Sequence, residues 1–336
     1  MHAELVVPGL LPRPDAPPFS RTPALELLLA RGRSTRGERS DYEQWLAAAC
    51  GSGEDAPLAA GALTLLAEGG EPGDAVWMRA DPVHLRLGRA GLSFVPAGAF
   101  ELDASESAAL AEALNLHYQG ELEFRPVSST AWCVRLAAPP RLVALPTAGV
   151  AGRDVDTNLP TGEDATLWHA RLNEIQMLLH AHPVNDARDA LGLPTVNSTW
   201  FWGAGRIPVA RDLRWQSVSA DEPVARGLAL HCRRRAMHLP ESAQAWLARL
   251  PEDGRHLAVL DALRMPLSLG DNAAWNEHLA GLEANWFAPL LEALRSGRIG
   301  MLTVHAPGDH PAFAIEAVRS DLRKFWRRRQ PLSAYA

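Results

Sequence analysis

Apolar residues in the first part of the chain follow two spacings. The run at 4–11 is short and apolar and is ended by Pro and Gly, as expected for a buried strand. The segments after it show helical spacing, with a Pro in the first turn of one and a Ser–Asp pair at the start of the next. Helices are therefore predicted at 22–32, 40–50 and 57–69.

From about residue 73 the pattern changes to an alternation of apolar and polar residues, which is typical of half-buried strands. It predicts a hairpin, a helix and two more strands, which together form a compact α+β unit. The predicted elements are 74–87, 91–95, 105–119, 121–127 and 131–137. A stretch rich in Pro and Gly follows at 139–162 and is the clearest boundary in the chain.

The second half returns to long helical patterns that alternate with short apolar runs. Helices are predicted at 163–182 and 275–297 and strands at 198–205, 256–263 and 299–307. Strands that alternate with helices favour a mostly parallel sheet covered on both faces. The pattern at 314–330 predicts an amphipathic basic helix, anchored to the core by Phe325 and Trp326.

These patterns predict an α/β protein with a discontinuous core and an inserted subdomain. Residues 1–72 and 150–336 are expected to form the core, and residues 73–149 the α+β insertion. The chain has 336 residues, of which 47% are hydrophobic, so it is long enough for such an arrangement.

Charge and cysteine content exclude several classes of function. The net charge of −6 and the absence of a long apolar run give no indication of nucleic acid or of a bilayer as a partner. Cys50, Cys133 and Cys232 lie far apart without CxxC spacing, which argues against a structural zinc site and a disulfide framework. The first residues do not read as a signal peptide, so a cytoplasmic location is expected.

The strongest candidate site lies at 178–206, LLHAHPVNDARDALGLPTVNSTWFWGAGR. Polar and basic side chains leave the long helix, and two glycines and an arginine end the strand that follows. Arginine suits bidentate recognition of phosphate or carboxylate, and glycine permits close backbone approach. A capped helix and a polar turn would explain the same residues. The predicted anion-binding set is Asn185, Arg188, Asn197, Gly203, Gly205 and Arg206, with His180 and His182 beside it.

Three weaker candidates follow other predicted elements. Asp309 and His310 follow the strand at 299–304 and could ligate a divalent metal, although a turn Asp beside a surface His is an ordinary combination. Ser40, at a predicted helix N-terminus, suits an anion or is a plain N-cap. Asp261 ends another strand, but its spacing from the acidic and histidine residues after it is loose.

Several segments resemble, in order, the cofactor-independent phosphoglycerate mutases of archaeal type, which belong to the alkaline phosphatase superfamily. TPALELLLARG resembles the family's TPNLDRLAREG helix, and RSDYEQWL resembles its GSD phrase, which carries the nucleophile. The segment 178–206 resembles the most specific phrase, HPVN…R…GKPAN…RGAG. The resemblance implies an alkaline phosphatase-like core, with Ser40 as the catalytic residue and Asp309 and His310 as metal ligands.

The departures from that family concern its two divalent cations. Pro8 stands where the resemblance places a ligating Asp, the DxxxH phrase is not recognisable, and no His follows His310. Metal coordination activates the nucleophilic Ser in such enzymes, so Ser40 alone is a poor nucleophile. We therefore expect no cofactor and a degenerate relative, a pseudoenzyme.

A second resemblance, through the HPVN…R…N…W-WG-G phrase and FWRR near the end, is to bacterial proteins of the Rpf regulatory group. Two hypotheses follow. In the first, the chain is a regulatory or ligand-binding protein that keeps an anion pocket for a phosphorylated small molecule and contacts a regulatory protein partner. In the second, it is an active metal-dependent phosphotransferase, mutase or phosphatase that uses Ser40 with Mn²⁺ or Mg²⁺.

Overall fold

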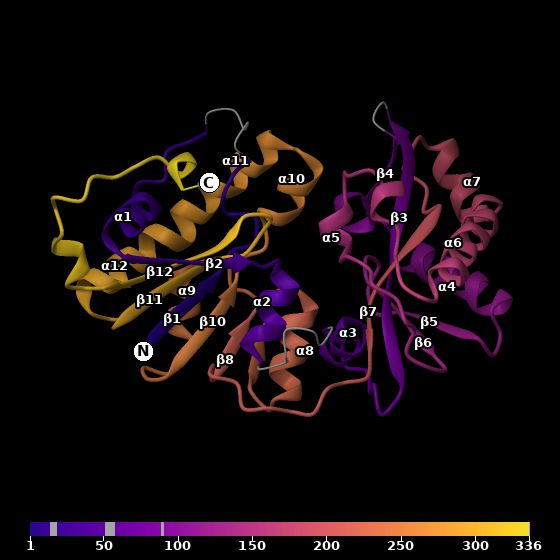
Figure 1. Ribbon diagram of the computed structural model, residues 1–336, viewed down its shortest axis with the longest axis horizontal. Coiled ribbons are helices and arrows are strands. Elements are labelled where there is room, and N and C mark those ends of the chain that lie inside the picture. Colours follow the sequence, from indigo (N-terminus) through magenta and orange to yellow (C-terminus); the bar gives the residue numbers. More distant parts are fainter. Residues whose placement is uncertain (14–18, 51–57, 89–90, 336) are drawn as a thin grey trace. The chain divides into compact units, whose positions relative to one another are not determined.

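The computed structural model describes residues 1–13, 19–50, 58–88 and 91–335. The chain divides into two compact units (Figure 1), each described by itself below. Unit 1 comprises Met1–Asp55 and Ala210–Ala336, and unit 2 comprises Ala56–Val209.

Unit 1 is built on a seven-stranded sheet in the order β2-β12-β11-β1-β10-β8-β9. Strands β11, β1, β10, β8 and β9 are parallel. On one side β12 pairs antiparallel with β11, and β2 pairs antiparallel with β12. In the central strand, His2 pairs with Arg255 of β10 and with Met301 of β11. The strands are β1 His2–Val6, β2 Arg33–Arg39, β8 Ser217–Ser219, β9 Arg235–Met237, β10 Arg255–Val259, β11 Met301–Ala306 and β12 Pro311–Val318.

Helices cover both faces of this sheet. Leucines of α1, α11 and α12, together with Trp246 of α9, pack with Leu5 and Val304 into the main core. On the opposite face, Trp45 of α2 contacts the rings of Trp215 and His305. The helices are α1 Pro23–Arg31, α2 Tyr42–Ala49, α8 Pro223–His231, α9 Ala243–Ala248, α10 Arg264–Leu269, α11 Asn272–Leu282 and α12 Ala288–Ser296, with the π turn η3 Glu283–Phe287 and the 3-10 turns η4 Asp321–Arg323 and η5 Leu332–Ala334.

Unit 2 is a five-stranded antiparallel sheet between two helical layers. Its order is β4-β3-β6-β5, and β7 also pairs with β3. The strands are β3 Val76–Gly88, β4 Gly91–Pro96, β5 Leu122–Pro126, β6 Trp132–Leu136 and β7 Ser198–Gly205. The helices are α3 Ala60–Ala67, α4 Ala104–His117, α5 Thr147–Val150, α6 Ala165–His180 and α7 Pro183–Ala190, with the turns η1 Ala97–Ala99 and η2 Asp156–Asn158.

The two helical layers of unit 2 pack against the sheet in different ways. Helices α4 and α6 bury leucines and Trp168 against one face. On the other face α3 lies very close to the strands, because a Cβ on Gly61 would meet the backbone of Met78 at 2.5 Å. Gly203 in β7 has φ +63°, and a Cβ there would lie 2.5 Å from Cβ of Ala60. Glycine is therefore required at this contact.

The structure confirms the predicted α/β class and the mostly parallel sheet, and it differs from the sequence predictions in several places. No element was predicted between residues 206 and 256, where the structure has β8, α8, β9 and α9. The second unit is larger than the 73–149 insertion, because β7 belongs to its sheet, α3 and α6 pack on that sheet, and α7 packs on α4. The predicted helix at 314–330 is wrong, since β12 occupies its first part and η4 is a short turn. The strand β2, RSTRGER, has no apolar pattern and was not predicted. Residue 57, the first of one predicted helix, lies outside the described residues.

Candidate functional site

The carboxyl edge of the parallel strands is the first place to seek a site in unit 1, because ligands bind there in open α/β sheets. Strands β1, β8, β10 and β11 all end at this edge. The residues that follow them include Pro8, Glu222 and Asp261, and then the segment 307–310.

The structure brings two of the weaker sequence candidates together. The backbone N–H of Gly308 donates to the carbonyl of Ser40 at 2.9 Å, so Ser40 lies beside the segment that carries Asp309 and His310. The Ser40 hydroxyl donates to the carbonyl of Asp41 at 3.2 Å. Asp41, and not Ser40, caps α2, because its carboxylate accepts from the N–H of Gln44 at 2.7 Å. Ser40 is thus half-buried next to the cap.

Asp309 is exposed and His310 is half-buried, and both contact protein atoms. Arg39 donates from Nη2 to Oδ1 of Asp309 at 2.7 Å, and the Asp309 side chain is 61% exposed. Nδ1 of His310 lies 2.9 Å from the carbonyl of Pro311. A cation at Asp309 would have to share this carboxylate with a guanidinium.

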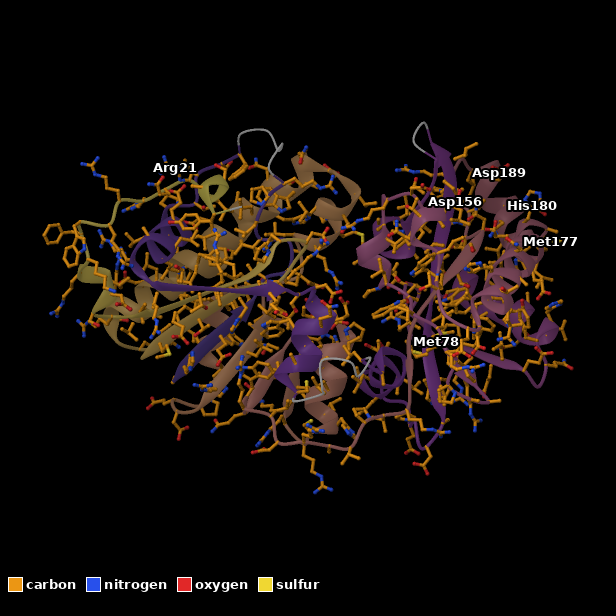
Figure 2. All side chains as sticks on the ribbon, viewed as in Figure 1. Arg21, Met78, Asp156, Met177, His180 and Asp189 are labelled. Atoms are coloured by element: carbon orange, nitrogen blue, oxygen red, sulfur yellow. The ribbon has the colours of Figure 1, made fainter. Side chains whose placement is uncertain are left out.

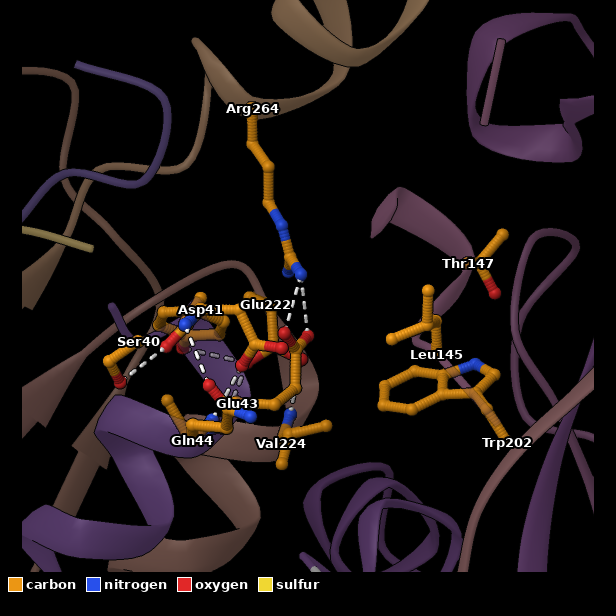
Figure 3. A network of polar contacts seen from close by, with 12 residues as sticks. Ser40, Asp41, Glu43, Gln44, Leu145, Thr147, Trp202, Glu222, Val224 and Arg264 are labelled. Carbon is orange, nitrogen blue, oxygen red and sulfur yellow. Dashed lines mark hydrogen bonds and ion pairs between the residues drawn. The ribbon is translucent and has the colours of Figure 1, made fainter. Parts of the chain in front are cut away.

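A network of acidic residues around one arginine lies at the same edge (Figure 3). Nη2 of Arg264 donates to both carboxylate oxygens of Glu43, at 2.7 and 2.6 Å. The Arg264 guanidinium also lies 5.1 Å from the ring centre of Tyr42, whose hydroxyl donates to Glu222 at 3.1 Å. Glu222 in turn accepts from the first N–H groups of α8.

Burial shifts the pKa values of these acidic groups upward. Burial, reinforced by Glu222, raises the pKa of Asp261 to about 6. Burial also raises the pKa of Glu43, although Arg264 opposes that shift. The Tyr42 pKa is raised well above 10 by burial and by the charge of Glu222. Asp261 therefore titrates near neutral pH, which is a common property of groups at functional sites.

The pKa of a second buried acid, Glu4 of β1, is shifted in the opposite direction. Its carboxylate is 2% exposed and accepts from Nε1 of Trp215 and Nη2 of Arg214, both at 3.0 Å. Burial opposes ionisation, but His305, Trp215 and Arg214 together lower the pKa of Glu4 to about 2. Hydrogen bonds to the charged form hold Glu4 ionised.

In unit 2, the predicted anion-binding residues of α7 have structural contacts. Asn185 is 4% exposed, and its side chain donates to the carbonyls of Leu179 and Val196 and accepts from the N–H of Val196. Arg188 is 2% exposed and donates to the carbonyls of Pro194 and Glu101 and to the carboxylate of Glu106, at 2.6–2.7 Å. These bonds fasten the loop after α7 to the unit.

The other members of that set also serve the fold of unit 2, with one exception. Asn197 bonds to both the N–H and the carbonyl of Leu85, and Gly203 and Gly205 allow α3 to approach β7. His182 caps α7, while His180 and Asp189 lie exposed on the outer side of α6 and α7 (Figure 2). The exception is Arg206, which is exposed and lines a groove.

This groove is a hollow of about 970 Å³ in unit 2. Arg125, Arg135 and Arg206 line it together with Trp77, and four acidic side chains share its walls. Arg125 and Arg135 both pair with Glu123, and Arg206 donates to the carbonyl of Asp74. The groove thus offers guanidinium groups at the surface, whereas Arg188 is enclosed.

Sequence reasoning missed Glu43, Tyr42, Glu222 and Arg264. Each lies in a segment that reads as an ordinary helix end, and only the sheet order brings them to one edge. Asp261 carried a usable signal, since it directly follows a buried strand. Among the described residues, no group of three or more His, Cys, Asp or Glu side chains is placed to hold a metal ion. Within the same residues, no helix is long and apolar enough to cross a membrane.

Comparisons with known proteins give one partial sequence match and two structural matches. No family model matches the chain. The 2,3-bisphosphoglycerate-independent phosphoglycerate mutase of Methanothrix thermoacetophila is 35% identical over 66 residues, a match that covers 20% of this chain and only 17% of the mutase. A cofactor-independent phosphoglycerate mutase from Thermoplasma acidophilum matches in structure with a TM-score of 0.43 at 17% identity, over 100% of this chain and 94% of that chain.

The PH0037 protein of Pyrococcus horikoshii has a TM-score of 0.59 at 14% identity, over 99% of this chain and 92% of that chain. At this identity the likeness shows the fold alone. The chain therefore has the fold of this archaeal protein, and one fifth of its sequence is similar to a phosphoglycerate mutase.

Proposed function

We propose that this chain is a phosphoglycerate mutase-like protein of alkaline phosphatase type that has lost metal-assisted phosphoryl transfer and serves a ligand-binding or regulatory role. The 66-residue similarity and the shared fold support the relationship. The residues at the carboxyl edge of the sheet in unit 1 support the loss of metal-assisted phosphoryl transfer. A cytoplasmic location, a regulatory protein partner and membership of the bacterial Rpf group form part of the same proposal.

The observation that carries the proposal is that arginines pair with two of the carboxylates at this edge. Arg39 binds Asp309, and Arg264 binds both oxygens of Glu43. A divalent cation placed at either carboxylate would face a guanidinium a few ångströms away. The repulsion is strong at Glu43, which is largely buried, and weaker at Asp309, which is exposed.

The donors that remain do not fit two hard cations. Such ions take six or more oxygen ligands or a near-octahedral set. Pro8 offers no side-chain donor at the end of β1, and His310 could offer only Nε2, because its Nδ1 lies 2.9 Å from the carbonyl of Pro311. No reaction step is therefore assigned to a metal here.

The groove in unit 2 is the place where we expect a ligand. Arg206 was predicted from sequence as anion-binding, and Arg125 and Arg135 add two exposed guanidinium groups to the same hollow. Guanidinium binds phosphate or carboxylate through paired hydrogen bonds. Because Glu121 and Glu123 also line the groove, a ligand with both an anionic and a hydrogen-bond-donating end fits better than a bare anion.

The alternative function is a metal-assisted phosphotransferase that uses Ser40, Asp309 and His310. One observation favours it, namely the bond from Gly308 to Ser40 that brings the predicted nucleophile beside the predicted ligands. In that case Arg39 would have to release Asp309 when the metal binds.

Metal analysis combined with activity assays separates the two functions. The purified chain is dialysed against Mn²⁺, and its metal content is measured together with mutase and generic phosphatase turnover. Ser40→Ala is compared with Ser34→Ala, a matched control on the exposed strand β2. We expect no turnover above background and no stoichiometric metal. Metal bound in stoichiometric amount, with turnover lost in Ser40→Ala and kept in Ser34→Ala, would overturn the proposal.

Ligand binding is tested separately with 3-phosphoglycerate and inorganic phosphate. We expect a rise in melting temperature that Arg206→Ser and Arg135→Ser reduce and Arg298→Ser, an exposed arginine of unit 1, does not. A shift unaffected by the two groove variants would show that the groove is not the site.

A further inference from the structure

A second surface, in unit 1, has a composition that the proposed function does not use. The segment 323–329, RKFWRRR, carries five basic residues around two aromatic ones. Phe325 is 80% exposed and Trp326 is 66% exposed, and their rings lie 5.3 Å apart in an edge-to-face contact. The sequence predicted that these rings anchor a helix to the core. In the structure they point to solvent, and we call residues 323–329 the basic-aromatic segment.

The fold fastens this segment to the end of α1 and the start of β2. Arg31 donates to the carbonyl of Leu322, and Arg327 donates to the carbonyl of Gly32 at 3.0 Å. Lys324 pairs with Asp321 at 2.7 Å, and Asp321 also accepts from the N–H of Val318. The backbone is therefore held on both sides of the two rings, which leaves Phe325 and Trp326 displayed on the surface.

The charge of the segment is opposite to that of the whole chain. Five positive charges fall within seven residues, whereas the chain has a net charge of −6. Arg33 and Arg36 of the neighbouring strand β2 are also exposed. Such an asymmetry orients the molecule in the field of an anionic surface and presents this face to it.

We propose that the basic-aromatic segment docks the protein on an anionic lipid surface. Trp and Phe side chains sit favourably at the headgroup level of a bilayer, and basic residues near an anionic leaflet add an attraction that salt screens. The two features occur together at the same protruding segment. They also match the reversible binding of a peripheral protein, in which no part of the chain spans the bilayer.

Nucleic acid is the main competing partner for a basic surface with aromatic residues. Single strands bind through bases stacked on the faces of open rings. In the edge-to-face pair, one ring covers part of a face of the other. The pair is therefore better suited to insertion between lipid headgroups than to stacking with bases. This geometry favours lipid as the partner.

Vesicle flotation with the full chain tests the proposal. The vesicles are phosphatidylcholine alone or phosphatidylcholine with one-third phosphatidylserine, at low and high NaCl. The test variants are Phe325→Ala/Trp326→Ala and Arg323→Ser/Arg328→Ser. The matched controls are Leu116→Ala/Met177→Ala, which removes two exposed apolar side chains of unit 2, and Arg86→Ser/Arg298→Ser, which removes two exposed charges elsewhere.

We expect binding only to vesicles with phosphatidylserine. Removal of the two arginines should weaken it about 30-fold, as two basic residues near such a surface contribute. The aromatic variant should weaken it by a similar factor, while both controls bind as the wild type does. The fluorescence difference between wild type and Trp326→Phe should shift to shorter wavelength on binding, which isolates this ring from the other ten Trp residues.

Two results would overturn the proposal. One is the absence of flotation with phosphatidylserine at low salt. The other is binding that the test and control variants weaken equally. If the same test variants abolish binding of a single-stranded oligonucleotide while vesicles do not bind, the surface recognises nucleic acid and not lipid. Thermal unfolding of each variant confirms that the fold is kept.

Discussion

Two polar clusters of this chain each contain an arginine bonded to a glutamate, but they differ in what their other hydrogen bonds connect. In unit 2, Asn185 and Arg188 bond mainly to backbone carbonyls of nearby loops. In unit 1, Arg264, Glu43, Tyr42 and Glu222 bond to one another at the end of the parallel strands. The first cluster holds a loop in place, and the second places titratable side chains together at an edge where ligands bind.

This difference shows why a concentration of polar residues in a sequence does not identify a site. Asn185 and Arg188 are among the least exposed polar side chains in the structure. Buried polar groups need partners, and a loop that crosses a core supplies many carbonyls that need donors. Side chains that hold a loop in place and side chains that bind a ligand are therefore of the same residue types. The hydrogen-bond partners of each side chain distinguish the two roles.

The largest effect is expected from Arg188→Ala in unit 2. The change removes three hydrogen bonds, leaves Glu106 without its guanidinium and opens a cavity. Loss of one partner of a buried pair costs about 3–5 kcal/mol. Urea unfolding should show this loss, with the amides of β7 exchanging faster. A loss below about 1 kcal/mol would contradict the structural role.

In the unit 1 network, Arg264→Met should lower the free energy of unfolding by about 3 kcal/mol, because Glu43 is left buried without its cation. The double variant Glu43→Gln/Arg264→Met should regain much of the lost stability, since the unpaired Glu43 carboxylate is gone. A double-mutant cycle measures the recovery. Additive single effects would show that the two side chains are not coupled.

The pH dependence of stability should distinguish two acidic residues of unit 1, Asp261 and Glu4. Its folded pKa of about 6 lies above the ordinary value of 3.8, so the folded state holds the proton more tightly than the unfolded state. Stability contributed by the protonated carboxyl is present below pH 4 and is lost as pH rises through 6.

Asp261→Asn should accordingly stabilise the protein at pH 8 by roughly 2 kcal/mol, allowing for partial exposure, and have little effect at pH 4. Glu4→Gln supplies the opposite control. The Glu4 pKa is lowered to about 2, so its contribution is present above about pH 4.5 and is lost as pH falls toward 2. Thermal unfolding across pH 3–8 measures the stability change of each variant. The same dependence on pH for Asp261→Asn and Glu4→Gln would contradict the opposite pKa shifts of the two acids.

The smallest effect is expected from Ser40→Ala. Its hydroxyl makes a single hydrogen bond of 3.2 Å to the adjacent residue, and Asp41 caps the helix. Surface changes of this kind stay within about 0.5 kcal/mol. A larger loss in urea unfolding would show that the Ser40 hydroxyl supports the edge in a way that its contacts do not reveal.

The fold was predictable from the sequence where one spacing dominated. The hairpin of β3 and β4, the helix α4 and the central strands carry strong alternation or helical periodicity. The strand β2 was not predictable, because all seven residues are exposed and only its pairing with β12 makes it a strand. At 314–330 the alternating residues Phe313, Ile315 and Ala317 pair with β11, and this pairing prevails over the helical pattern.

The candidate site was predictable only in part. The position of Ser40, Asp309 and His310 at one edge followed from strand ends and from the family resemblance, and the structure places them in neighbouring segments. The pairing of Arg39 with Asp309 and of Arg264 with Glu43 joins residues 270 and 221 positions apart. Such contacts depend on the sheet order, which spacing along the chain does not contain.

The proposed loss of metal-assisted chemistry is tested most directly by the manganese content of the wild-type chain. The protein is equilibrated with excess Mn²⁺, dialysed and analysed for bound metal, alongside Arg39→Ser, which frees the Asp309 carboxylate from its guanidinium. The account predicts well below one ion per chain for the wild type. One or two ions per wild-type chain, removed by Asp309→Asn, would contradict it.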